Sequence, residues 1–121
     1  MKHLQQGRKL GRTRNQRKAL KKTLLGSLIM HEKIKTTEAK AKEIKPLIDK
    51  IINKAKRSAI ETKKAAVIRD LMAEIPAMAV KKITGGFLDK FSGRKSGYAR
   101  IIKLAPRKGD AAKIVIIEFV D

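Results

Sequence analysis

The chain has 121 residues and a formal net charge of +20, from 31 Lys and Arg against 11 Asp and Glu. This length suffices for one compact domain, and a hydrophobic fraction of 42% supplies a core of mainly Ile, Leu, Val and Ala. The absence of cysteine excludes disulfides and thiolate zinc sites. So strong a positive charge attracts polyanions, which leaves nucleic acid, an anionic membrane surface or an acidic protein as candidate partners.

The apolar segments are far shorter than the roughly 20 residues that a helix needs to span a membrane. The basic N-terminus is not followed by an apolar stretch of signal-peptide type, so no export signal is visible. Together these features predict an intracellular protein.

The N-terminal segment concentrates basic residues. The stretch GRKLGRTRNQRK, residues 7–18, contains six Arg or Lys, and no acidic residue precedes Glu32. Residues 1–14 lack a periodic apolar pattern and are predicted to form a basic arm. Residues 15–121 are predicted to form a single α+β domain.

The first helix is expected from Asn15, as its N-cap, to about His31. Leucine recurs every four residues at positions 20, 24 and 28, which is typical of an amphipathic helix. The opposite face carries like-charge pairs four residues apart, which destabilise an isolated helix. Positive charge near a helix N-terminus also opposes the helix dipole. We therefore expect an external anion to neutralise this segment.

Alternation of β-branched residues in KIKTT, residues 33–37, predicts a short edge strand. A second helix is expected from Glu38 to about Ser58, with Thr36 or Thr37 as N-cap. Its apolar face is formed by Ile44, Ile48, Ile51, Ile52 and Ala55. Pro46 lies inside this pattern and predicts a kink or a restart near Lys45.

A third helix is expected from about Thr62 to Ile75, ended by Pro76. Its apolar positions are Ile68, Leu71, Met72 and Ile75. A fourth, weaker helix is expected over residues 77–91, with a break at Gly85–Gly86, since each glycine destabilises a helix by roughly 1 kcal/mol relative to Ala.

Two strands end the chain. YARIIKL (98–104) and KIVIIEFV (113–120) are rich in β-branched residues, and the turn-forming APRKGDAA between them predicts an antiparallel pair. A basic Gly/Ser loop, SGRKSG, precedes them at residues 92–97. The order of elements predicts an α+β fold, with about four helices packed on a small sheet.

No catalytic constellation is visible. His3 and His31 lack metal-ligand spacing, the acidic residues are scattered, and Walker and GxGxxG motifs are absent. We therefore predict no enzymatic activity, no cofactor, no metal and no small-molecule substrate. Binding remains, and the low aromatic content favours phosphate contacts and shape recognition of folded RNA over base stacking. Tyr98 could either stack on a base or belong to the core.

Four blocks of the sequence, in order, resemble one family. They are MKHLQQGRKLGRTRNQRKAL, SLIMHEKIKTTEAKAKEIK, GRKSGYARIIK and RKGDAAKIVIIEFV, and the second includes His31, Glu32, Thr36, Thr37, Lys40 and Lys42. Over essentially its whole length the chain is similar to bacterial large-subunit ribosomal protein seventeen. The segment from Glu61 to Gly86 matches loosely, and Pro46 and Pro76 depart from the family pattern.

The resemblance implies a helix-rich domain with a three-stranded mixed sheet and a structural role in the cytoplasmic large ribosomal subunit. It also implies contact with large-subunit ribosomal RNA near the outer surface of the exit tunnel, and with neighbouring ribosomal proteins including protein thirty-two. The expected RNA-binding residues are Lys2, His3, Arg8, Lys9, Arg12, Arg14, Arg17, Lys18, Lys21, Lys22, Lys35, Arg94, Lys95, Tyr98, Arg100, Lys103, Arg107 and Lys108.

Two alternatives stay open at this point. A DNA-binding architectural protein would also have basic arms, although the chain lacks a recognisable wedge or dimer signature. A membrane-surface protein would need large apolar anchors, and the first helix has Leu but neither Trp nor Phe. A small nuclease is discounted because the acid or histidine constellation is missing.

Overall fold

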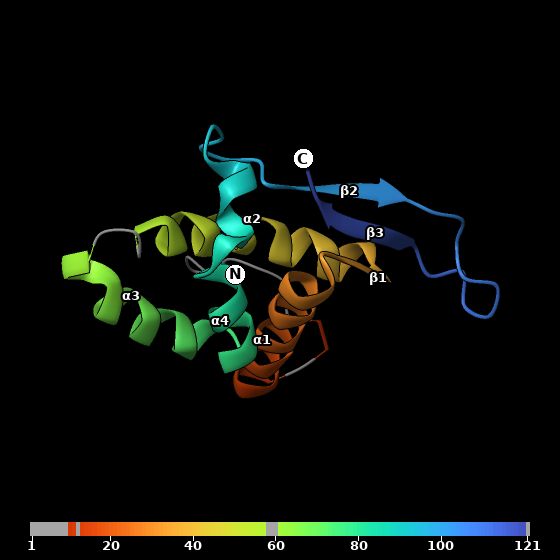
Figure 1. Ribbon diagram of the computed structural model, residues 1–121. Coiled ribbons are helices and arrows are strands. Elements are labelled where there is room, and N and C mark those ends of the chain that lie inside the picture. Colours follow the sequence, from red (N-terminus) through yellow and green to blue (C-terminus); the bar gives the residue numbers. More distant parts are fainter. Residues whose placement is uncertain (1–9, 12, 58–60, 121) are drawn as a thin grey trace, which may run out of the picture.

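A computed structural model describes residues 10–11, 13–57 and 61–120, with the backbone alone for residues 61–63. The elements in order are α1 (Arg14–His31), β1 (Lys33–Thr37), α2 (Glu38–Lys56), α3 (Glu61–Glu74), α4 (Ala77–Ile83), the 3-10 helix η2 (Gly86–Phe91), β2 (Ala99–Lys103) and β3 (Ile114–Phe119). Helix α2 lies against a small three-stranded sheet and also contacts α1 and α3, while α4 packs against α1 and α3 (Figure 1). The expected α+β fold is confirmed.

The sheet has three strands in the order β1-β3-β2, and both pairings are antiparallel. The expectation of a mixed sheet is therefore wrong. The loop between β2 and β3 forms a hairpin, so these strands must run in opposite directions. β1 pairs with the other edge of β3 and, like β2, runs antiparallel to it. The register aligns Ile34, Ile117 and Ile101 across the sheet.

The N-cap of helix α1 lies two residues earlier than expected. It is Thr13 and not Asn15, because Thr13 and Gln16 form a capping box. The Thr13 hydroxyl accepts from the Gln16 amide at 3.3 Å, and the Gln16 side chain accepts from the Thr13 amide at 3.0 Å. The first turn of α1 contains no acidic residue that would complement the helix dipole.

Of the expected kink or restart near Lys45, the restart does not occur, because helix α2 runs through Pro46 as one continuous helix. Proline removes the hydrogen bond to the carbonyl of Lys42. Lys42 and Pro46 are both exposed, so water can reach that carbonyl. The apolar face of α2 is buried as expected, from Ile44 to Ala55.

The later helices divide where the sequence indicated. α3 ends at Glu74 before Pro76, and the predicted fourth helix separates into α4 and η2 around Gly85. Met72 does not belong to the buried face of α3, since it is 49% exposed, and Val67 is buried instead.

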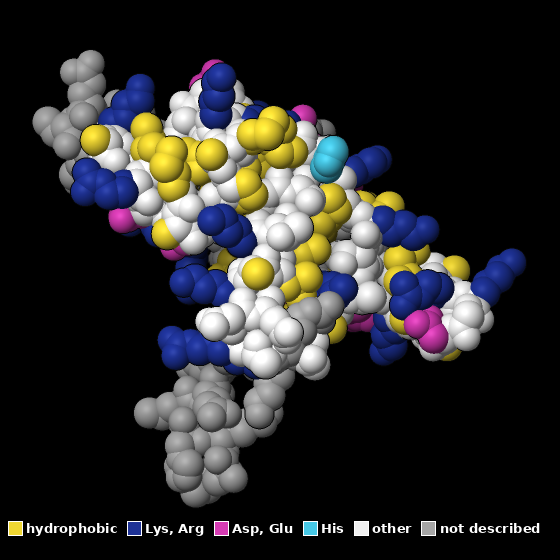
Figure 2. All heavy atoms as spheres, turned by 90° about the horizontal axis from the view of Figure 1, so that it is seen from below, with side chains coloured by type: hydrophobic (Ala, Val, Ile, Leu, Met, Phe, Trp, Pro, Cys, Tyr) yellow, Lys and Arg dark blue, Asp and Glu magenta, His cyan; other side chains and the backbone are white. Residues whose placement is uncertain are grey.

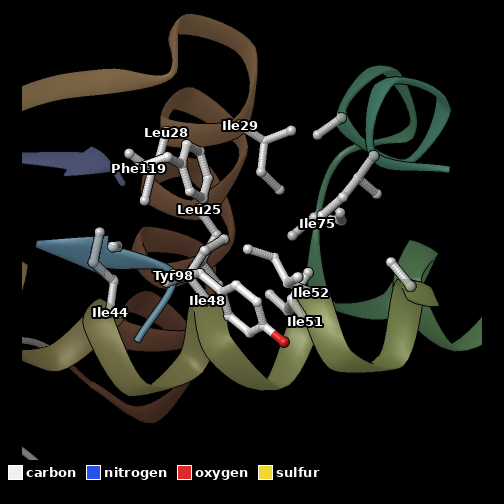
Figure 3. Packing of buried hydrophobic residues seen from close by; sticks show 14 of the residues in the cluster. Leu25, Leu28, Ile29, Ile44, Ile48, Ile51, Ile52, Ile75, Tyr98 and Phe119 are labelled. Carbon is white, nitrogen blue, oxygen red and sulfur yellow. The ribbon is translucent and has the colours of Figure 1, made fainter. Parts of the chain in front are cut away.

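The core lies between α2, the sheet and the other helices. Figure 3 shows Ile44, Ile48, Ile51 and Ile52 of α2 on the side where Tyr98 and the α1 residues lie. Helix α1 approaches the α3–α4 junction closely at Gly26, where an added Cβ would be 2.7 Å from the Pro76 ring. Within the described ranges, no helix is long and apolar enough to cross a membrane.

Candidate nucleic-acid interface

The basic side chains of α1 differ in their exposure and in their contacts with neighbouring helices. Arg14 and Lys18 are exposed, whereas Arg17, Lys21 and Lys22 are partly buried. The Lys21 ammonium is 3.2 Å from Glu43 Oε1 of α2, and Lys22 donates to the Met72 carbonyl of α3 at 3.3 Å. Lys21 and Lys22 thus hold α1 against its neighbours, while their ammonium groups remain near the surface.

Several expected RNA-binding residues lie outside the described residues. They are Lys2, His3, Arg8, Lys9 and Arg12. On the face shown in Figure 2, Lys and Arg side chains are spread widely while Asp and Glu are few. The described part of the chain therefore already presents a basic surface without these five residues.

The loop at residues 92–97 is fixed by polar side chains of α2. Asp49 accepts from the amides of Gly97 and Tyr98, at 3.2 and 3.1 Å. Lys56 donates to the carbonyls of Phe91 and Arg94 and to the Tyr98 hydroxyl. All three ammonium protons of Lys56 are used. The backbone on both sides of the exposed Arg94 and Lys95 is therefore held in place.

Tyr98 is a core residue, so its expected role in stacking on a base is wrong. Its side chain is fully buried, and its ring makes an edge contact with Phe91 at 5.3 Å between centroids. The hydroxyl is satisfied inside the protein, since it accepts from Lys56 and donates to Asn53 Oδ1. Burial of a tyrosine hydroxyl requires such partners.

The loop between β2 and β3 is held by contacts within the loop itself and not by a helix. It extends away from the helices at the far end of the sheet (Figure 1). Arg107 binds Asp110 through two parallel hydrogen bonds of 3.0 and 2.8 Å. This guanidinium, together with the Ala112 amide, lowers the pKa of Asp110 to about 2. Lys108 at the tip is exposed.

A polar cleft of about 350 Å³ brings Lys35 of β1 and Arg107 together with Lys40 of α2. Thr36, Thr37 and Ile114 complete its lining. Lys40 was not among the expected binding residues. Lys35 and Lys40 can hold an anion such as a phosphate there, whereas the Arg107 guanidinium is already bound by Asp110.

Strand β2 contributes two more expected residues. Arg100 is exposed and pairs with Glu118 on β3 at 2.8 Å, which reduces its availability to an external anion. Lys103 is exposed at the other end of the strand.

The expected residues do not form one site. Arg94 and Lys95 precede β2, whereas Arg107 and Lys108 follow it. A strand of five residues spans about 17 Å. The chain therefore presents separate groups of Lys and Arg side chains on α1 and at the two ends of β2.

Sequence reasoning missed Asp49, Asn53 and Lys56. All three lie on α2, more than 30 residues before the loop that they hold. The only sequence signal was their spacing of three or four residues, which places them on one helix face. In the described ranges, no group of three or more His, Cys, Asp or Glu could hold a metal ion.

Comparison with known proteins gives consistent matches. The family described as "Ribosomal protein L17" matches residues 20–120. "Large ribosomal subunit protein bL17" of Shouchella clausii (strain KSM-K16) is 44% identical over 116 residues, covering 93% of this chain and 97% of the relative. Its namesake from Chlorobium chlorochromatii (strain CaD3) is 45% identical over 115 residues, covering 94% and 71%. That from Staphylococcus haemolyticus (strain JCSC1435) is 41% identical over 120 residues, covering 94% and 98%.

Proposed function

Because this chain belongs to the ribosomal protein L17 family, we propose that it is a structural constituent of the large ribosomal subunit and binds large-subunit ribosomal RNA. The observation that carries this proposal is the family match over residues 20–120. The net charge of +20 is consistent with a polyanionic partner. We assign the chain no catalytic role, in keeping with the structural ribosomal proteins among its relatives.

RNA phosphates would supply the negative charge that α1 lacks. Arg14 and Lys18 are like charges four residues apart on an exposed face, and the first turn has no acid. An isolated helix would favour Glu there. A phosphate backbone against this face removes both penalties. We propose that the basic arm of residues 1–14, the exposed face of α1 and the loops at residues 92–97 and 104–113 contact the RNA.

The family resemblance supports a finer location. We propose that the protein lies near the outer surface of the peptide exit tunnel and contacts protein thirty-two. Chemical crosslinking of purified large subunits, followed by mass spectrometry, tests this location. We expect crosslinks from exposed lysines of this chain to protein thirty-two, and crosslinks only to distant subunit proteins would contradict the location.

The first experiment is a sucrose gradient of cell lysate at moderate salt, with fractions probed for this protein. We expect co-sedimentation with the large subunit at one copy per particle, unaffected by digestion of chromosomal DNA. Recovery at the top of the gradient, or with the nucleoid, would contradict the proposal. Recovery with the nucleoid would favour a DNA-binding architectural protein instead.

Binding through phosphates also predicts a salt dependence. If the protein neutralises about eight phosphates, the logarithm of affinity for ribosomal RNA should fall with the logarithm of salt at a slope of roughly −6 to −7. Filter binding at several salt concentrations measures this slope. A flat response would exclude phosphate contacts as the main source of affinity.

A further inference from the structure

A cleft with an apolar floor lies between α1, α2 and α3. Its volume is about 190 Å³. Leu25 and Ile51 at its base are 3% and 2% exposed, so the base is part of the hydrophobic core. We call it the α1–α3 cleft, and its lining is Lys18, Lys21, Lys22, Leu25, Leu47, Lys50, Ile51, Ala73 and Glu74.

The edge of the α1–α3 cleft is strongly positive. Its one acidic residue, Glu74, is neutralised by Lys54 at 2.8 Å. Lys21 is paired with Glu43, and Lys22 donates to a carbonyl and so keeps its full charge. Among the described residues, neither Lys18 nor Lys50 has a carboxylate partner. The cleft thus combines an apolar base with at least three cations that no internal carboxylate neutralises.

This combination restricts the occupant. An apolar protein side chain would match the base of the cleft but would leave the lysines without a counter-charge. A free phosphate would match the lysines but would leave the apolar base exposed. An unstacked nucleobase satisfies both, because its flat face is apolar and it is attached to phosphates on either side.

The size of the cleft agrees with this occupant. A volume of about 190 Å³ lies below the roughly 300–1,000 Å³ of pockets that enclose drug-sized ligands. A cleft of this size suits one ring system rather than a whole ligand of several rings.

We propose that the α1–α3 cleft receives one unstacked base of the bound RNA, with Lys18 and Lys50 on the adjacent phosphates. This inference rests on the proposed binding of ribosomal RNA. It adds α2 and α3 to a contact region that sequence reasoning confined to α1 on this side of the molecule. Aliphatic side chains would contact the face of the base in place of an aromatic ring.

The decisive variant fills the cleft without removing charge. Ala73→Leu places a larger side chain into the cleft from an exposed position of α3, while Ala65→Leu makes the same change at an exposed position of that helix outside the lining. The full-length protein is bound to large-subunit ribosomal RNA, and base reactivity is mapped by chemical probing at nucleotide resolution. Circular dichroism confirms that both variants are folded.

We expect the wild-type protein to protect an unpaired base and Ala73→Leu to restore its reactivity. Affinity should fall about tenfold, which corresponds to the loss of about 1.4 kcal/mol. Ala65→Leu should leave both unchanged. If Ala73→Leu binds and protects like the wild type, the cleft proposal is overturned while RNA binding stands. If the wild type does not bind the RNA, the proposed function itself fails.

A second pair of variants tests the charges and guards against misfolding of Ala73→Leu. Lys50→Gln should weaken binding and reduce protection next to the same base, whereas Lys45→Gln, exposed elsewhere on α2, should not alter protection there. Equal protection patterns for the two variants would overturn the proposal. If Ala73→Leu lowers incorporation into subunits without changing the RNA footprint, the occupant is a protein side chain and the proposal is wrong.

Discussion

The loops at residues 92–97 and 104–113 each present an adjacent Arg and Lys, but they are stabilised in opposite ways. The first is tied to α2 by Asp49 and Lys56, whose partners include the fully buried Tyr98. The second is closed by its own Arg107–Asp110 pair and extends from the sheet. The Arg-Lys pair therefore lies on a loop anchored to α2 in the first case and on a hairpin stabilised by its own contacts in the second.

The difference has a functional meaning. A loop that is already ordered loses little conformational entropy when it binds, and its cations are held in fixed positions. A hairpin tip that is held only by its own local contacts can change conformation more easily to fit its partner. We therefore expect the 92–97 loop to determine where the protein binds and the 104–113 loop to add affinity.

The largest expected effect comes from Lys56→Met. This change removes the donor that holds two carbonyls and the Tyr98 hydroxyl. Hydrogen bonds to a charged group contribute about 1.5–3 kcal/mol, so the free energy of unfolding should fall by about 2–3 kcal/mol. Urea denaturation measures it. Lys108→Met in the other loop is the matched control and should stay within about 0.5 kcal/mol of wild type; equal effects would contradict the comparison.

Asp49→Ala should have the next largest effect. It leaves the amides of Gly97 and Tyr98 without their carboxylate acceptor, which should lower the free energy of unfolding by about 1–2 kcal/mol. Hydrogen exchange at these two amides should accelerate. Asp110→Ala removes the corresponding acid of the exposed loop and should lower global stability less than Asp49→Ala does, because exposed ion pairs contribute little. A larger loss from Asp110→Ala would reverse the assignment of the rigid loop.

A smaller effect concerns binding. Lys95→Gln and Lys108→Gln should each reduce the salt slope of RNA binding by about one unit if each lysine contacts a phosphate. Lys95→Gln should lower affinity more, because its loop is already ordered in the free protein. Filter binding of the two variants under identical salt conditions decides this. A larger loss for Lys108→Gln would show that the extended loop contributes the stronger contact.

The smallest expected effect is a pH dependence confined to the 104–113 loop. The pKa of Asp110 is lowered to about 2 by Arg107 and the Ala112 amide. Since this value lies below the unfolded one, the ion pair's contribution is complete above pH 4 and is lost as pH falls through about 2. NMR titration of the Asp110 carboxyl measures its pKa directly. Arg107→Gln should raise this pKa towards 3.8, its ordinary value.

Much of the fold could be predicted because local patterns determine it. The isoleucine spacing of residues 44–52 placed α2, and Gly85 separated α4 from η2. The start of α1 was misplaced because the leucine period does not locate a cap, although the capping pair Thr13 and Gln16 stands in the sequence. The restart expected at Pro46 does not occur, because its exposed position lets water satisfy the carbonyl that loses its hydrogen bond.

The site was harder to predict because its supports are distant in sequence. Nothing in the neighbourhood of Tyr98 reveals that Lys56, 42 residues earlier, will satisfy its hydroxyl. The amino-acid composition indicated which residues could bind an anion. It could not separate cations used within the fold, such as Lys21, from free ones such as Lys18. Nor could it reveal that Lys50 shares a cleft with α1.

The central position of β3 has a consequence for synthesis. β1 and β2 pair only with β3, and β3 follows both in the chain. Ile114 is added 77 residues after its partner Thr37, a delay of roughly 4 to 15 s at about 5–20 residues per second. During that time β1 has no strand to pair with. Its exposed Lys33 and Lys35 then have a protective use, because lysines on an unpaired strand discourage pairing with another nascent chain.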